Sequence, residues 1–184
     1  MDELLQNRIP HAPQMGLFVI PEIPEDRLTN ALVDYAYHVS ADEVVALYDA
    51  TLSGNAKDGA VFAVDRFIFQ NTDLERPQTV RYRDLVGIEL KRRWLGIAGK
   101  KIDLQIRRGR TSFELTMDFS GQPEAADYVA HFLEAALHYE PQTKEADPGE
   151  PTTDVEAVRR ALGRLRRDNK LTDEDYHRLL SALD

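Results

Sequence analysis

The chain has 184 residues, of which 42% are hydrophobic and 30% are charged, and its formal net charge is −9. This length fits one domain of about 100–150 residues with small additions. The sequence contains no cysteine, which excludes disulfides and thiolate metal sites. No apolar run approaches the ~20 residues that span a bilayer, and the acidic start at Asp2 and Glu3 is unlike a secretory signal. We therefore expect a cytoplasmic protein.

Residues 1–39 are predicted to form an arm followed by a helix. Within residues 1–22, three prolines alternate with one short apolar run at 17–20. We expect this arm to have little structure of its own and to dock on a sheet face or at a subunit contact. From Pro24 the pattern becomes helical, because a proline and two acids suit a first turn and apolar residues then recur at three-four spacing to about His38.

Residues 40–140 are predicted to be an α+β domain of about seven short strands capped by one helix. Strand-forming or alternating segments occupy residues 44–48, 61–64, 67–69, 79–83, 86–91, 102–107 and 112–117. Alternation implies strands with one wet face, so we expect an antiparallel sheet. A helix over 122–139 follows from an apolar stripe made of Ala126, Val129, Ala130, Leu133, Ala136 and Leu137. Such a helix suggests a cap on a sheet or an open barrel.

The remaining residues are predicted to be a linker, 141–153, and a helical hairpin, 154–184. The linker holds three prolines and one alanine as its only aliphatic residue. About thirty residues of hairpin cannot bury enough surface alone, so we expect this unit to drive homo-oligomer formation. The residues predicted to mediate self-association are Val155, Val158, Leu162, Leu165, Leu179, Leu180 and Leu183.

The segments 42–48, 58–69 and 80–88, followed by one helix, resemble the bacterial pleckstrin-homology-like (PH-like) domains. In the last segment, Tyr82-Arg83-Asp84-Leu85 resembles the family's "tyrosine, x, aspartate, aliphatic" corner. Residues 162–183 resemble the short C-terminal helical hairpin called SHOCT. The resemblance implies a PH-like antiparallel β-barrel or sandwich. It also implies a binding or oligomerisation module whose partners are lipid headgroups, phosphorylated ligands or proteins.

The sequence carries no motif that indicates catalysis or metal binding. It has no Gly-rich phosphate loop, no H-E-x-x-H and no nucleophile elbow. The five histidines are scattered, and His131 and His138 lie two helical turns apart, too far to share a metal easily. We therefore expect a protein that is not an enzyme and that has no catalytic residues, no cofactor and no metal.

Positive charge is concentrated between Arg76 and Arg110. This segment holds eleven Lys/Arg and three Asp/Glu, a balance of +8, so the remainder of the chain carries −17. Its centre, 91–101, reads as a hairpin in which two basic clusters flank an apolar tip. The residues predicted to bind a ligand or partner are Lys91, Arg92, Arg93, Trp94, Leu95, Lys100 and Lys101.

The basic hairpin has three interpretations. Trp94 can fold into the core and leave the cations as a solvated rim, the tip can contact a partner protein, or it can bind an anionic lipid surface. Nucleic acid is not favoured, because few aromatic residues interleave with the arginines that could join the same face. Those arginines are Arg81, Arg83, Arg107, Arg108 and Arg110. The leading hypothesis is a self-associating module with a protein partner of unknown identity, and lipid binding is the alternative.

Overall fold

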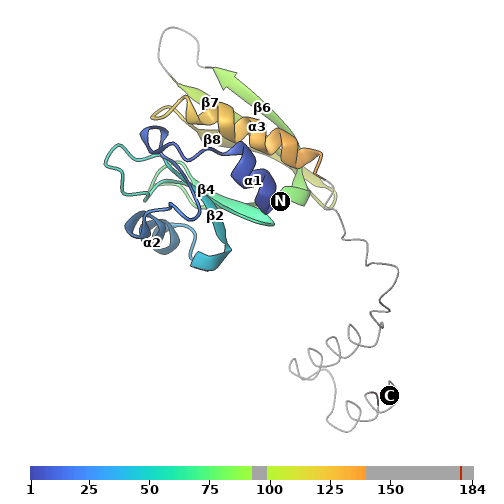
Figure 1. Cartoon of the computed structure of the whole chain (residues 1–184). Helices are drawn as coiled ribbons and strands as arrows, with labels where there is room; N and C mark the ends of the chain where they lie inside the picture. Colours follow the sequence, from blue (N-terminus) through green and yellow to red (C-terminus); the bar gives the residue numbers. More distant parts are fainter. Residues whose placement is uncertain (93–98, 140–178, 180–184) are drawn as a thin grey trace. The chain divides into compact units, whose positions relative to one another are not determined.

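The computed structural model describes residues 1–92, 99–139 and 179. The chain divides into two compact units, residues 1–140 and 141–184. The first unit is α+β, which confirms the expected class (Figure 1). Its helices are α1 (Asp2–Arg8), α2 (Glu25–Asp34) and α3 (Ala125–Leu137).

Two antiparallel sheets make up the β part of this unit. The first has the order β1-β2-β3-β4-β5 and the second the order β6-β7-β8. The strands of the first sheet are β1 (Leu17–Val19), β2 (Val44–Asp49), β3 (Gly59–Ala63), β4 (Arg66–Gln70) and β5 (Gln78–Arg81). Those of the second are β6 (Leu85–Arg92), β7 (Lys100–Arg108) and β8 (Thr111–Asp118). The seven predicted strands correspond to β2–β8.

The two sheets are not closed into a barrel. Among the described residues no ladder joins β5 to β6, because the short 3₁₀ turn Tyr82–Asp84 carries the chain from one sheet to the other. Side chains from both sheets nevertheless share one hydrophobic core, in which Phe62 and Phe67 of the first sheet accompany Ile102 and Leu104 of the second. Stacked sheets, and not a closed cylinder, are therefore what the structure contains.

The expectation of one wet face is wrong for strands β2 and β3 of the five-stranded sheet, whereas the edge strand β5 keeps Thr79 and Arg81 exposed. Every residue of β2 and β3 is buried. The inner face packs into the shared core, whereas the outer face is covered by α2 and the turn that follows it, through Ala31, Tyr35 and Ala36. In Figure 1, α2 lies on the opposite side of β2 and β4 from α1 and α3. The expectation holds for the three-stranded sheet, where residues such as Gln105 and Arg107 are exposed.

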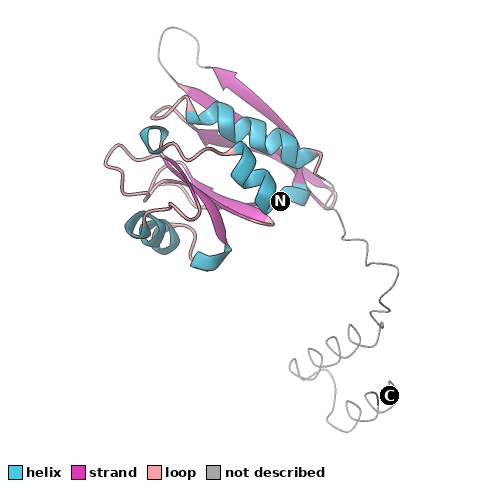
Figure 2. Cartoon of the chain, in the orientation of Figure 1, coloured by secondary structure: helices cyan, strands magenta, loops and turns pink. Residues whose placement is uncertain are grey.

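The first 22 residues are more structured than the sequence predicted. Residues 2–8 form α1, which buries Leu5 and packs against α3 (Figure 2). The apolar run at 17–20 lies within the sheet instead of on its face, because β1 pairs with β2 along its backbone. The ladder satisfies the backbone groups that face β2, Leu17 exchanges hydrogen bonds with Ala12 on the other side, and the side chains of Leu17, Phe18 and Val19 are buried.

Helix α3 closes the core as predicted. The stripe residues from Ala126 to Ala136 are buried, while His131, Glu134 and His138 are exposed on the other side. Phe132 was not assigned to the stripe, yet it is fully buried, with its ring edge-on to Phe62 and to Tyr82. A single aromatic residue therefore links α3 to both β3 and the turn between the sheets.

The predicted linker and almost all of the predicted hairpin lie outside the described residues. Of the self-association stripe, the structure describes Leu179, which is helical and 41% exposed. The other six residues of the stripe, from Val155 to Leu183, remain predictions. In the part of the chain that is described, none of the helices combines the length and the apolar character needed to cross a membrane.

Candidate functional site

The basic hairpin predicted from the sequence is present at the ends of β6 and β7. The register places Lys91 opposite Lys101 and Arg92 opposite Lys100. The tip, 93–98, which contains Arg93, Trp94 and Leu95, lies outside the described residues. The opposed basic strand ends are therefore confirmed, and the contacts of the tip stay a prediction.

Each lysine of this hairpin has an acidic partner. Lys91 Nζ lies 2.6 Å from Asp103 Oδ2 and 3.3 Å from Glu89 Oε2. Lys100 pairs with Asp127 of α3, and Lys101 Nζ lies 3.6 Å from Asp118 Oδ2. Within the described residues, Arg92 is the cation of this cluster that has no such partner. Most of the positive charge is thus compensated inside the protein.

The Lys91–Asp103 contact shifts both groups toward their charged forms. Burial by itself would raise the pKa of Asp103, but hydrogen bonds from Lys91 and from Thr116 Oγ1 (2.6 Å) hold that pKa below its ordinary value. The hydrogen bond to Asp103 is also the main reason that the pKa of Lys91 is raised. Both stay ionised near neutral pH, so this pair is a structural element of the sheet.

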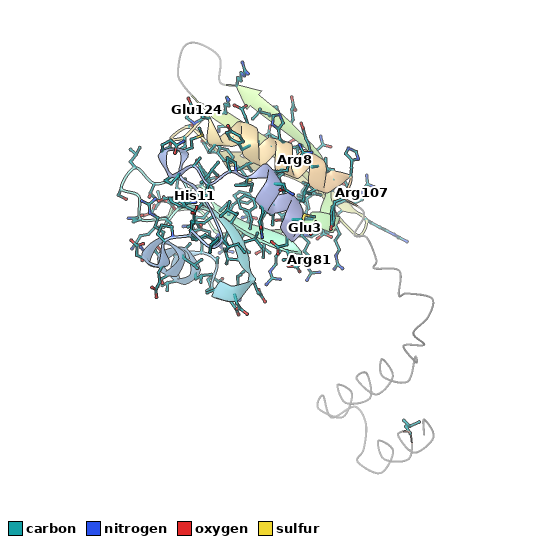
Figure 3. All side chains as sticks on the ribbon, in the orientation of Figure 1. Glu3, Arg8, His11, Arg81, Arg107 and Glu124 are labelled. Atoms are coloured by element: carbon teal, nitrogen blue, oxygen red, sulfur yellow. The ribbon has the colours of Figure 1, made fainter. Side chains whose placement is uncertain are left out.

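A second basic cluster lies at the opposite end of the same strands. We call it the arginine end, and it consists of Arg81, Arg83, Arg107, Arg108 and Arg110. These arginines lie apart from the lysines along the strands, although the alternation of side chains places Arg107 on the same side of the sheet as Lys101. Leu85 pairs with Ile106 at one end of the β6–β7 ladder and Arg92 pairs with Lys100 at the other, a separation of about 20 Å at strand spacing. Figure 3 shows Arg81 and Arg107 at one end of the unit.

The turn Tyr82–Asp84, which carries the family resemblance, shapes the arginine end. Tyr82 is buried, and its hydroxyl donates to the carbonyl oxygen of Ala63 at 3.1 Å. Burial, with a smaller effect of Asp65, raises the pKa of Tyr82 well above its ordinary value, so the phenol keeps the proton that it donates. With Tyr82 anchored in this way, Asp84 lies beside two cations: Arg108 Nε is 3.6 Å away and Arg83 Nε is 3.8 Å away.

A hollow of about 490 Å³ opens at this crossing between the sheets. We call it the arginine hollow, and its walls are Pro77, Gln78, Thr79, Arg81, Asp84 and Arg108. Arg108 is oriented by three contacts. Its Nη2 donates to the carbonyl oxygen of Thr79, its Nε faces Asp84, and its guanidinium lies over the Phe113 ring at 5.4 Å. These contacts hold the guanidinium as part of the wall.

Arg81, in the same wall, is not compensated. It lies directly opposite Arg66 in the β4–β5 ladder, a position where like charges repel. Arg66 is neutralised by Asp65 at 2.7 Å and by Glu43 at 2.8 Å. No acidic partner of Arg81 occurs among the described residues. The hollow therefore presents one free guanidinium and one that is partly engaged.

Another large hollow, at the other loops of the first sheet, has the opposite charge. It has a volume of about 760 Å³, lies between the β2–β3 and β4–β5 loops, and is lined by Asp34, Asp58 and Asp73 together with Leu52 and several polar residues. Two of these acids already have partners, since Lys57 lies 3.8 Å from Asp34 and Gln70 donates to Asp58 at 3.2 Å. In the described part of the chain, no group of three His, Asp or Glu side chains is arranged to hold a metal ion.

No protein-family model, curated protein or solved structure matches this chain. The predicted PH-like and SHOCT-like assignments accordingly stay predictions. The choice between a protein partner and an anionic lipid surface therefore has to be argued from the charge and shape of the described surface.

The arginine end was missed in the sequence although a signal for it was present. In an antiparallel meander, the connections before residue 86 and after residue 107 fall at one end, and the connection after residue 91 falls at the other. Tracking strand ends, instead of counting charges along the segment, would have separated the arginines from the lysines. The Arg108–Thr79 and Arg108–Asp84 contacts, by contrast, need the tertiary structure.

Proposed function

We propose that this chain is a non-enzymatic binding module with a PH-like arrangement, and that it contacts an acidic partner protein through the arginine end. The order of seven strands followed by α3 supports the PH-like part of the proposal. The observation that carries the binding part is the gathering of five arginines at one end of the sheets, where two of them, Arg81 and Arg108, line a hollow whose wall contains a single acid, Asp84.

Electrostatics favour an acidic protein segment over an extended anionic surface. The arginine end has a local balance of +4, five arginines against Asp84, whereas the whole chain carries −9. A polyanion larger than the patch would meet the acidic remainder, while a short acidic segment would meet the arginines alone. Arginine is also enriched at protein interfaces, where its planar fork pairs with carboxylates.

A short poly-L-glutamate peptide is a suitable probe for this proposal, because it can meet the arginine end without extending over the acidic remainder. We expect the full chain to bind it at low salt. The affinity should fall as the salt concentration rises, because salt ions screen the attraction between the arginines and the glutamates. The variant Arg107→Glu/Arg110→Glu changes two exposed arginines outside the hollow and should abolish binding, measured by fluorescence anisotropy. The control Arg92→Glu changes an exposed arginine of the lysine hairpin and should bind like the natural chain. Equal losses in the two variants, or no binding at all, would contradict the proposal.

Anionic lipid binding through residues 91–101 is the second candidate. The opposition of Lys91 to Lys101 and of Arg92 to Lys100 supports it, and each cation near such a surface is worth about 1 kcal/mol. The ion pairs of the three lysines lower that expectation. Co-sedimentation with anionic and neutral vesicles tests it. Binding that requires the anionic lipid and is lost in Arg92→Glu/Lys101→Glu would favour this candidate over the first.

Self-association through residues 154–184 is a further part of the proposal. It is supported by the two apolar stripes of the predicted hairpin and by the division of the chain after residue 140. Deletion of residues 142–184 should lower the particle mass in sedimentation velocity by more than the deletion itself accounts for. A mass that falls in simple proportion to the deletion would remove self-association from the proposal.

A further inference from the structure

We propose that the hollow between the β2–β3 and β4–β5 loops binds an aliphatic diamine, whose two ammonium groups are held by Asp34, Asp58 and Asp73. We call it the acidic hollow, and its volume is about 760 Å³. It shares no lining residue with the arginine hollow, so the inference does not rest on the proposed function.

The acidic hollow carries a negative charge that the protein leaves largely uncompensated. Three carboxylates and one ammonium group, that of Lys57, line it, which gives a balance of −2. Lys57 Nζ lies 3.8 Å from Asp34 Oδ2, which is a long contact, and Asp58 accepts one hydrogen bond from Gln70. Asp73 has neither an ion pair nor a hydrogen bond among the described residues. A dication therefore matches the charge of the wall.

A buried hydroxyl group beside these acids lacks a partner. Tyr35 is 1% exposed, and its hydroxyl makes no hydrogen bond in the described part of the chain. Burial raises the pKa of Tyr35 well above its ordinary value, and the nearby carboxylates of Asp49, Asp58 and Asp34 raise it further. Because Asp34 and Asp58 also line the hollow, the hydroxyl is directed toward its inner wall.

The first sheet explains why Tyr35 faces the acidic hollow. The Tyr35 ring lies in the apolar cluster on the outer face of this sheet, together with Leu47 of β2 and Ile68 of β4. Side chains two residues apart on a strand point to the same face. Gln70, two residues beyond Ile68, therefore continues that face, and it lines the hollow. The acidic hollow is thus the polar end of the surface on which Tyr35 packs.

The wall fits ammonium groups better than a metal ion. An ammonium group offers three N–H donors, which can pair with carboxylate and hydroxyl oxygens that do not converge on one point. A metal ion such as Mg²⁺ or Ca²⁺ needs several oxygens within about 2.0–2.6 Å of one centre. No group of three His, Asp or Glu side chains among the described residues is arranged in that way. The Tyr35 oxygen can accept a hydrogen bond from an ammonium group, which supplies the partner that it lacks.

The rest of the wall fits a short hydrocarbon chain between two charges. The acids come from three separate segments, namely the end of α2, the residue before β3 and the β4–β5 loop, so two linked ammonium groups can reach different acids. Ala50 and Leu52 also line the hollow, and Leu52 is 93% exposed. Methylene groups of the ligand would cover apolar surface that otherwise faces water. The volume lies within the range of about 300–1,000 Å³ that is usual for small-molecule sites.

Titration calorimetry of the full chain with 1,4-diaminobutane at low salt tests the inference. We expect binding of the diamine, binding of 1-aminobutane that is weaker by about tenfold or more, and no binding of 1,4-butanediol, since one or both charges are lost. Mg²⁺ is the control for charge alone, because it carries the charge of the diamine without N–H donors, and it should bind more weakly. A Mg²⁺ affinity equal to that of the diamine, or no diamine binding, would overturn the inference.

An acid variant locates the site. Asp73→Asn removes an exposed charge from the hollow and should weaken diamine binding by about tenfold or more. Its control is Asp42→Asn, which removes an exposed charge near the start of β2, whereas the hollow lies beyond the end of that strand. The control should bind like the natural chain. Equal weakening by the two variants would indicate a general attraction of this acidic chain for cations, and the site would have to be abandoned.

Tyr35→Phe tests the buried hydroxyl. It should weaken diamine binding by about fivefold and leave the melting temperature unchanged, because the free chain loses no hydrogen bond. The control is Tyr82→Phe, which removes a hydroxyl that does have a partner, the carbonyl oxygen of Ala63. It should lower the melting temperature and leave diamine binding unchanged. Diamine binding that is unaffected by Tyr35→Phe, or weakened equally by both variants, would also overturn the inference.

Discussion

Replacing Phe132 by alanine is expected to be among the most destabilising single changes in this protein. The side chain is fully buried, and its ring meets Phe62 at 5.8 Å and Tyr82 at 5.6 Å, both nearly perpendicular. A buried Phe→Ala change costs about 3–5 kcal/mol. The loss of two edge-on aromatic pairs, each worth about 0.5–1.5 kcal/mol, places Phe132→Ala in the upper part of that range. For a unit of this size, the melting temperature should fall by roughly 10–15 °C.

Urea denaturation followed by near-ultraviolet circular dichroism measures this effect, because buried aromatic rings dominate that signal. The midpoint should shift and the slope should not, as expected when stability changes without a change in the surface exposed on unfolding. The control is His131→Ala, which removes an exposed neighbour on the same helix and should change stability by less than about 0.5 kcal/mol. A cost of Phe132→Ala below about 1 kcal/mol, or one equal to that of the control, would refute α3 as the element that closes the core.

Three further predictions concern single contacts, each checked by urea unfolding. Tyr82→Phe removes the hydrogen bond to the carbonyl oxygen of Ala63 and should cost about 1–2 kcal/mol; no loss would mean that the carbonyl finds another donor. Because the folded-state pKa of Asp103 is lowered, its contribution is present above its ordinary pKa near 4 and disappears as pH falls through the folded value. The stability difference between the natural chain and Asp103→Asn should therefore shrink below about pH 4, whereas a constant difference would contradict the Lys91 contact. Phe18→Asp places a charge at a site that is 2% exposed and should cost more than about 3 kcal/mol, and an unchanged midpoint would remove β1 from the sheet.

The strands β2–β8 and helix α3 were predictable because their signals are local. Alternation with period two and an apolar stripe with period 3.6 are properties of short windows, and each depends on burial of one face. The run Val86–Lys91 shows one such pattern and α3 shows the other. The antiparallel arrangement was predicted from the alternation itself, because strands with one exposed face are typical of antiparallel sheets.

The N-terminal elements and the second buried face were not predictable in the same way. Helix α1 has seven residues, too few for a periodic pattern, and its stability comes from packing Leu5 beside α3. Strand β1 exists because β2 offers it an edge. Continuous burial of β2 and β3 agrees with their unbroken apolar runs, Val44–Tyr48 and Ala60–Ala63, but only packing in the folded chain decides that α2 covers the outer face.

The same division applies to the candidate site. The sequence by itself determined that positive charge is concentrated between residues 76 and 110 of an acidic chain, since composition does not depend on the fold. Only the tertiary structure decided which of those charges remain uncompensated. Lys91 pairs with Asp103 of the neighbouring strand β7. Lys100 pairs with Asp127 of α3, which lies 27 residues further along the chain. Arg81 reaches the wall of a hollow because a turn brings β5 beside the end of β7. Pairing between charges depends on distances in space, which strand register and helix packing set, and these are properties of the folded chain as a whole.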